Sequence, residues 1–198
     1  MAAAGFGRRF VLALLLLPAF RPGAASAIEV DRERVWALLA KPGHVALMRH
    51  ADAPGTGDPA GFRIGDCATQ RNLGERGREQ ARRLGEEFRR RAIPVSLVLT
   101  SQWCRARDTA ALMALGPIED EPTALNSFFG RPGEREAATA ALRQRLAALP
   151  ADAGLVLMVT HQVNITALTG VFPASGEMVV LKRDASGAVV TVGRLPAP

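Results

Sequence analysis

VALMRHADAP, residues 45–54, decides the fold of this 198-residue chain. Its first four residues are apolar without polar alternation, which predicts a short strand buried on both faces. The run stops at Arg49 and His50, and Asp52 follows two positions later. Glycine, serine or aspartate would serve a plain turn better. The two basic side chains therefore indicate a site at the end of this strand.

Two further apolar runs, at residues 95–100 and 155–160, predict two more buried strands. Residues 118 and 178–192 add a short strand and a closing hairpin around Ser186-Gly187. Apolar residues at helical spacing predict helices at 31–40, 73–91, 105–115, 134–149 and 163–169. Alternation of strands and helices predicts an α/β fold of three layers, α/β/α, around a mostly parallel central sheet.

The N-terminal 27 residues have the features of a signal peptide. A basic start precedes the apolar stretch 10–20, and Ala25-Ser26-Ala27 is a candidate cleavage site. The alternative, an uncleaved anchor, is disfavoured because a spanning helix needs about 20 apolar residues. We expect one folded domain at 28–198, exported to the periplasm, with no membrane span after the signal is removed.

The formal charge of +6 does not indicate a nucleic-acid partner. Residues 1–27 contribute three arginines and no acids, so 28–198 has 22 basic and 19 acidic residues, a net charge of +3. The arginine-rich segment 75–91 has interleaved glutamates, a pattern typical of a solvated helix face. The ten aromatic residues do not form a basic stacking pattern. We therefore expect no nucleic acid among the partners.

Basic side chains follow all three predicted core strands. Arg49 and His50 follow the first, Ser101 and Arg105 the second, and His161 the third. Because ligands bind beyond the carboxyl ends of parallel strands, these side chains should converge. Guanidinium groups match phosphate oxygens in pairs, which predicts a phosphate site. A metal or other cofactor is not expected, because the two histidines lack a third ligand and adjacent arginines would repel a cation.

The same positions resemble the histidine phosphatase superfamily, which has the phosphoglycerate mutase-like fold. The resemblance covers roughly residues 44–170 and rests on four elements in order: Leu47-Met48-Arg49-His50-Ala51, Leu73-Gly74-x-x-Gly77-x-x-Gln80-Ala81, Ser101-x-x-x-Arg105-Ala106-x-Asp108-Thr109-Ala110 and Thr160-His161. Ala51 stands where the family usually has glycine. The resemblance implies a metal-independent phosphatase that hydrolyses a phosphomonoester through a phosphohistidine on His50. Arg49, Arg105 and His161 would hold the phosphate.

The chemistry of these residue types is consistent with that role. A neutral imidazole nitrogen can attack phosphorus and split one displacement into two easier steps. The other ring nitrogen of His50 must then be tied, and a backbone carbonyl would fix the required tautomer. The guanidinium groups would stabilise charge on the phosphoryl oxygens.

The general acid departs from the family pattern. One branch of the family has a glutamate where this chain has Asn126, and another has an aspartate where it has Gln162. Asp52 is the best placed replacement by sequence, although a loop-starting aspartate that accepts backbone hydrogen bonds is an equal alternative. Asp66 and Glu134 are further candidates with structural roles as their alternatives.

The substrate is a small phosphorylated compound whose identity the sequence leaves open. The exported pattern resembles a phosphatase of lipopolysaccharide core heptose phosphates, so a sugar phosphate is one expectation. A phosphohistidine protein phosphatase and a non-catalytic phosphate-binding domain are the alternatives. Phe128 and Phe129 either line a pocket for an apolar group or belong partly to the core.

Cys67 and Cys104 are the two cysteines of the chain. In an exported protein they could form a disulfide, which would tie the long loop 53–70 to the start of the helix that carries Arg105. Two buried thiols are the alternative, since the sequence does not show that they meet.

Overall fold

A computed structural model describes residues 1, 24–150, 152–184 and 188–198. Its centre is one six-stranded sheet with the order β3-β2-β4-β1-β5-β6. The strands are β1 (His44–Arg49), β2 (Val95–Thr100), β3 (Ile118–Asp120), β4 (Leu155–Thr160), β5 (Met178–Arg183) and β6 (Val189–Leu195).

The sheet is mostly parallel, as the continuous apolar runs predict. The four strands β1, β2, β3 and β4 are parallel to one another, whereas β5 runs antiparallel to β1 and β6 runs antiparallel to β5. Arg49 aligns with Thr160, and Thr100 aligns with Val159. The carboxyl ends of β1, β2 and β4 therefore lie side by side at one edge of the sheet.

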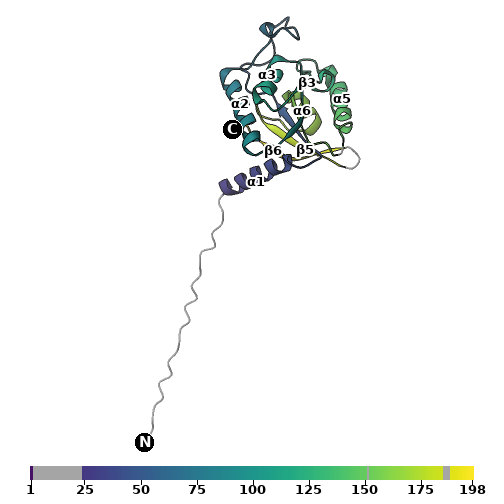
Figure 1. Ribbon diagram of the computed structural model, residues 1–198. Coiled ribbons are helices and arrows are strands. Elements are labelled where there is room, and N and C mark those ends of the chain that lie inside the picture. The colour runs from purple at the N-terminus through teal and green to yellow at the C-terminus, as the bar shows by residue number, and fades with distance from the viewer. Residues whose placement is uncertain (2–23, 151, 185–187) are drawn as a thin grey trace.

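Helices cover both faces of the sheet (Figure 1), which confirms the three-layer prediction. One face is covered by α1 (Ala24–Leu39), α2 (Glu75–Arg90) and α3 (Cys104–Met113). The other is covered by α4 (Pro122–Leu125), α5 (Arg135–Ala147) and α6 (Gln162–Thr169). Successive residues of β1 alternate between the two cores, with Val45 and Leu47 on the α5 side and Ala46 and Met48 on the α2 side.

Some predicted boundaries were wrong. The first helix begins at Ala24 instead of residue 31, so it includes the proposed cleavage residues 25–27. The rest of the proposed signal peptide, residues 2–23, lies outside the described part of the chain, as does the hairpin turn at 186–187. The short helices α4, η1 (Cys67–Thr69) and η2 (Pro132–Glu134) have too few residues to show a period.

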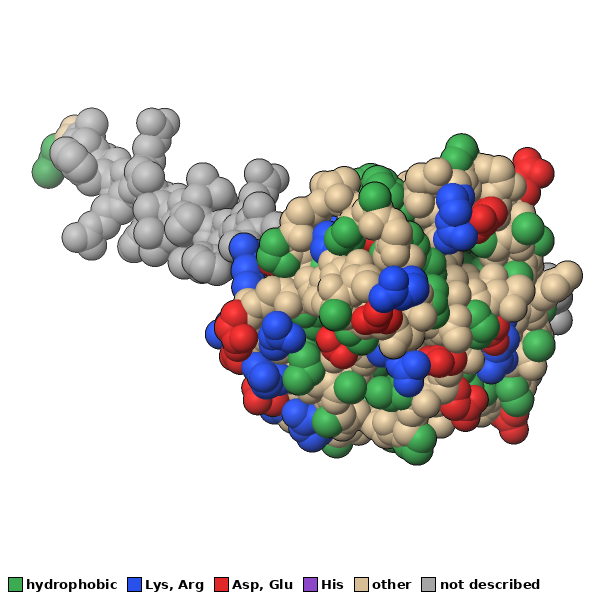
Figure 2. All heavy atoms as spheres, turned by 90° about the horizontal axis from the view of Figure 1, so that it is seen from above, with side chains coloured by type: hydrophobic (Ala, Val, Ile, Leu, Met, Phe, Trp, Pro, Cys, Tyr) green, Lys and Arg blue, Asp and Glu red, His purple; other side chains and the backbone are tan. Residues whose placement is uncertain are grey.

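The surface mixes charges of both signs. On the face in Figure 2, lysine and arginine side chains are interspersed with acidic ones, and no histidine is visible. The arginines of α2 form ion pairs with glutamates one turn away, among them Arg83 with Glu79 and Arg90 with Glu87. Within the described ranges, no helix is both long and apolar enough to span a bilayer.

Candidate active site

A cavity of about 300 Å³ opens beyond the carboxyl ends of β1 and β4. Arg49 is the last residue of β1, and His50 follows it with its amide bonded to the carbonyl of Thr160. His161 follows β4, and Arg105 lies in the first turn of α3. The structure thus brings these four predicted site residues to one cavity. The full lining is Arg49, His50, Gly55, Thr56, Gly57, Arg71, Arg105, Ser127, Phe129, His161, Gln162, Val163 and Phe172.

His50 is oriented by its own loop. Its Nδ1 lies 2.8 Å from the carbonyl oxygen of Ala51. Because a carbonyl only accepts, Nδ1 carries the proton and Nε2 keeps its lone pair. Burial, followed by the charge of Arg105, lowers the pKa of His50 to about 3, so the ring is neutral at pH 7. A neutral imidazole with a bare Nε2 is the state that a nucleophile requires.

The Ala51 segment is itself anchored to α3. The amide of Ala51 donates to Oγ1 of Thr109 at 3.0 Å, and that hydroxyl donates to the carbonyl of Arg105 at 2.7 Å. The nucleophile loop and the helix that carries the second arginine are therefore held in one hydrogen-bonded unit.

His161 faces His50, with ring centroids 5.3 Å apart. Its Nε2 lies 2.8 Å from Oγ of Ser101, and that hydroxyl donates to Oδ1 of Asn126 at 3.2 Å. With its proton given to Asn126, Ser101 accepts from Nε2–H of His161. Burial, then the charges of His50 and Arg105, lower the pKa of His161. Asn126, which stands where a family branch has glutamate, thus orients Ser101 and does not line the cavity.

Arg49 and Arg105 each bury an Nε atom without a hydrogen-bond partner among the described residues. Nη1 of Arg49 donates to the carbonyl of Pro173 at 3.0 Å. Buried donors are nearly always satisfied in folded proteins, so two such donors on residues that line one cavity favour a ligand that accepts hydrogen bonds. An anion that accepts from both guanidinium groups would satisfy them.

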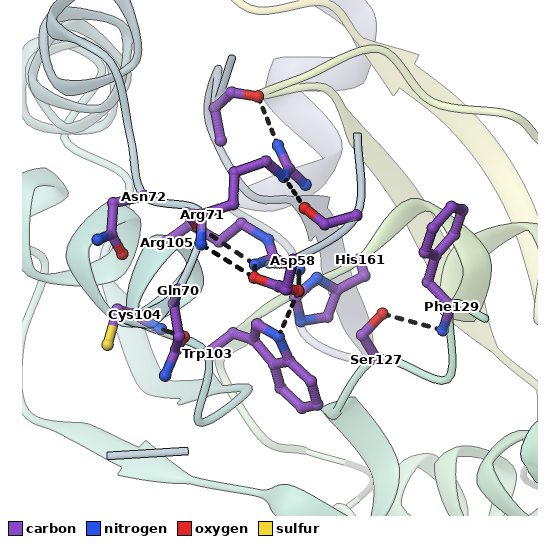
Figure 3. Close-up of polar contacts among 12 residues, drawn as sticks. Asp58, Gln70, Arg71, Asn72, Trp103, Cys104, Arg105, Ser127, Phe129 and His161 are labelled. Carbon is purple, nitrogen blue, oxygen red and sulfur yellow. Dashed lines mark hydrogen bonds and ion pairs between the residues drawn. The ribbon is translucent and has the colours of Figure 1, made fainter. Parts of the chain in front are cut away.

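Two members of the site, Asp58 and Arg71, were not predicted. Asp58 accepts from Nη1 and Nη2 of Arg105 at 2.7 and 3.1 Å, and from Nε1 of Trp103 at 3.0 Å (Figure 3). Burial alone would raise the pKa of the Asp58 carboxyl, but the hydrogen bonds and charge of Arg105 outweigh it and lower that pKa. Nε of Arg71 donates to the carbonyl of Gly57 at 2.7 Å, which directs a third guanidinium to the cavity.

Both missed residues lie in or next to the loop 53–70. They follow no strand and show no period, so the sequence carried no signal for them beyond the unusual length of the loop.

The candidate general acids do not line the cavity. Asp52 is fixed through its backbone, with its amide bonded to Oε1 of Gln80 at 3.0 Å and its carbonyl bonded to the amide of Gly74. Its charge does oppose the effect of burial on the pKa of Arg49. Asp66 and Glu134 form exposed ion pairs. In the described part of the chain, no aspartate or glutamate lines this cavity.

Cys67 and Cys104 form a disulfide, with Cα atoms 5.7 Å apart. Oε1 of Gln70 also accepts from the amide of Cys104 at 2.9 Å. Together these contacts join the loop that carries Asp58 to the first turn of α3, next to Arg105.

Phe128 and Phe129 separate in the structure. Phe128 is buried, whereas Phe129 is exposed and lines the cavity. The pocket role and the core role are thus divided between the two adjacent residues.

Comparison with known proteins gives one family match. Residues 45–131 match the model described as "Histidine phosphatase superfamily (branch 1)". This segment includes His50 and Arg105 and ends before His161. No curated protein sequence matches the chain.

Solved structures share the fold. The protein histidine phosphatase SixA in complex with tungstate is 20% identical, with a TM-score of 0.55, and the match covers 77% of this chain and 96% of that one. Mycobacterial glucosyl-3-phosphoglycerate phosphatase is 16% identical, with a TM-score of 0.57, over 80% of this chain and 100% of that one.

Proposed function

We propose that the chain belongs to the histidine phosphatase superfamily, whose model matches residues 45–131, and that it is a metal-independent phosphatase that uses His50 as its nucleophile. The observation that carries the proposal is the hydrogen bond from Nδ1 of His50 to the carbonyl of Ala51. It leaves a bare Nε2 in a cavity where two arginine donors lack partners.

The reaction would proceed in two displacements. Nε2 of His50 attacks phosphorus, the bond to the leaving group breaks with its electron pair, and a phosphohistidine forms. Water then attacks the phosphohistidine, phosphate departs and His50 is regenerated. Guanidinium groups of Arg49 and Arg105 stabilise the charge on the phosphoryl oxygens in both steps. Protonation of the departing group has no carboxylic acid to supply it among the described cavity residues.

The lack of a carboxylic acid among the described cavity residues favours a second candidate, a phosphohistidine protein phosphatase. Imidazole departs from phosphorus more readily than an alkoxide, so such a substrate depends less on a general acid. A sugar phosphate such as the predicted heptose phosphate would depend on it more. A comparison of turnover on a phosphohistidine peptide and on an alkyl phosphate distinguishes the two candidates.

The decisive experiment measures release of phosphate from p-nitrophenyl phosphate by the wild type and by His50→Ala. We expect the variant to lose turnover by at least about three orders of magnitude, as removal of a covalent nucleophile does. The matched control is His44→Ala, because His44 is also buried and lies at the opposite end of β1. Wild-type turnover in His50→Ala would refute the proposal. Tungstate binding without any turnover in the wild type would favour the non-catalytic domain.

The site of action is a separate proposal. We propose export to the periplasm after cleavage behind Ala27, on the basis of the apolar stretch 10–20 and the small residues 25–27. N-terminal sequencing of the protein recovered from the periplasm tests it. A mature chain that keeps residues 1–27 would contradict it.

A further inference from the structure

Two exposed phenylalanines lie on the wall of the proposed active-site cavity. Phe129 is 54% exposed and Phe172 is 68% exposed, and both line the cavity that contains His50. They come from separate loops, one after α4 and one after α6. Exposed phenylalanines at one cavity suggest contact with an apolar part of a ligand.

A second, adjoining cavity extends the aromatic character. It shares Gly57, Ser127 and Phe129 with the first, and its lining includes Phe62 and Trp103. In the view of Figure 3, Arg71 and Arg105 lie to one side of His161, and Ser127 and Phe129 lie to the other. Phe129 thus lies apart from the two arginines in this view, whereas Trp103 donates to Asp58, the ion partner of Arg105.

The distribution of aromatic residues strengthens this observation. The described part of the chain has seven: Trp36, Phe62, Phe88, Trp103, Phe128, Phe129 and Phe172. Four of the seven line these two cavities, whereas Trp36 and Phe88 meet edge to face in the core. Phe62, Phe129 and Phe172 are not buried, so packing of the core does not account for these three side chains.

Two polar side chains of the cavity wall, Gln162 and Ser127, form hydrogen bonds within their own segments. Nε2 of Gln162 donates to Oγ1 of Thr166 at 2.8 Å, and Oγ of Ser127 accepts from the amide of Phe129 at 3.2 Å. A polyhydroxylated leaving group would need several free hydrogen-bonding partners at this position. Beside its arginines and histidines, the wall offers the apolar surface of Phe129, Val163 and Phe172.

We propose that the preferred substrate is an aryl phosphate whose ring contacts Phe129 and Phe172. The inference rests on the proposed phosphatase function and deepens it by naming the leaving group. When Nε2 of His50 attacks phosphorus, the P–O bond breaks and its electron pair leaves on the aryl oxygen. The ring delocalises this charge, so the step proceeds without a carboxylic acid in the cavity, and the aryl oxide takes its proton from water.

The test compares two substrates whose leaving groups are similarly acidic and differ in aromaticity. Phenyl phosphate provides the ring, and hexafluoroisopropyl phosphate provides an aliphatic group. For the wild type, we expect kcat/KM to be about tenfold higher for phenyl phosphate, the scale of two aromatic contacts. Equal values for the two substrates would overturn the inference.

Variants locate the effect. Phe129→Ala and Phe172→Ala should each lower kcat/KM for phenyl phosphate by about two- to tenfold and leave the aliphatic substrate unchanged. Val190→Ala is the matched control, because Val190 is exposed on β6, outside the two cavities. Equal losses on both substrates would refute an aromatic contact. Both side chains are exposed, so unchanged thermal unfolding should show that the variants fold.

The two proposals can fail separately. If His50→Ala abolishes hydrolysis of both substrates and the wild type has the same kcat/KM for both, the phosphatase proposal stands and the proposed preference for aryl phosphates is refuted. If His50→Ala hydrolyses both at the wild-type rate, the phosphatase mechanism itself falls.

Discussion

Replacement of Asp58 by alanine tests how the site holds a buried arginine. The Asp58 carboxylate makes two hydrogen bonds to Arg105, at 2.7 and 3.1 Å, and the exposed fractions of the two side chains are 9% and 3%. It also accepts from Nε1 of Trp103 at 3.0 Å and from the amide of Arg71 at 3.1 Å. Asp58→Ala removes all four bonds and leaves the Arg105 guanidinium without its counter-ion.

The expected loss in free energy of unfolding is about 3–5 kcal/mol, the usual cost of removing one partner of a buried ion pair. The lowered pKa of Asp58 fixes the sign of the pH dependence. A carboxyl whose pKa is lower when folded stabilises the protein above its unfolded pKa of about 3.9. The difference in free energy of unfolding between the wild type and Asp58→Ala should therefore have its largest value at pH 7. It should decrease as the pH falls through the pKa of Asp58 in the folded protein.

Urea unfolding at pH 7 measures this difference. The matched control is Asp66→Ala in the same loop, because Asp66 pairs with Arg63 at the surface and should contribute less than about 1 kcal/mol. Saturating tungstate should reduce the difference in free energy of unfolding between the wild type and Asp58→Ala, since a bound anion would pair with the Arg105 guanidinium that has lost its carboxylate. A loss for Asp58→Ala no larger than that for Asp66→Ala would refute the reasoning.

Three further perturbations have defined outcomes. His50 and His161 are buried and neutral with lowered pKa values, so each should take up a proton on unfolding below about pH 6.5. The free energy of unfolding should therefore decrease by about 1.4 kcal/mol for each histidine and each unit by which the pH is lowered. In urea titrations across pH 4–6.5, His50→Ala should reduce this slope by the contribution of one histidine, and an unchanged slope would contradict the prediction. Reduction of the Cys67–Cys104 bond, which spans 37 residues, should lower the free energy of unfolding by about 2–4 kcal/mol and should lower activity. Thermal unfolding measures the first effect, and identical melting temperatures with and without reductant would contradict a stabilising role of the disulfide. Gly77→Ala should lower the free energy of unfolding by at least about 2 kcal/mol, because the added Cβ would lie 1.9 Å from the carbonyl oxygen of Asp52. Gly133→Ala is the control, because its Cβ would meet nothing within 4 Å. Equal stability of the two variants would contradict the close packing at Gly77.

The sheet and its site edge could be predicted because their signals are local. The continuous apolar runs of β1, β2 and β4 identify buried parallel strands, and the polar residue after each run then falls at one edge. The convergence of Arg49, His50 and His161 follows from topology alone.

The partners from the loop could not be predicted. Asp58 contacts Arg105 across 47 positions of sequence, and this pairing depends on how the loop 53–70 folds over α3. Nothing in the residues around Asp58 distinguishes it from Asp52 or Asp66. Sequence position favoured Asp52 as an acid at the site, whereas in the structure Asp58 is the carboxylate that contacts a cavity arginine, as the ion partner of Arg105.

The most direct test of the account is the chemical identity of the covalent intermediate. Rapid quenching of the wild type during turnover of phenyl phosphate, followed by mass spectrometry of peptides under alkaline conditions, locates any phosphoryl group. We predict that it lies on His50 and is lost in acid. A phosphoryl group on another residue, or complete turnover in a His50→Ala variant, would contradict the central claim that this imidazole attacks phosphorus.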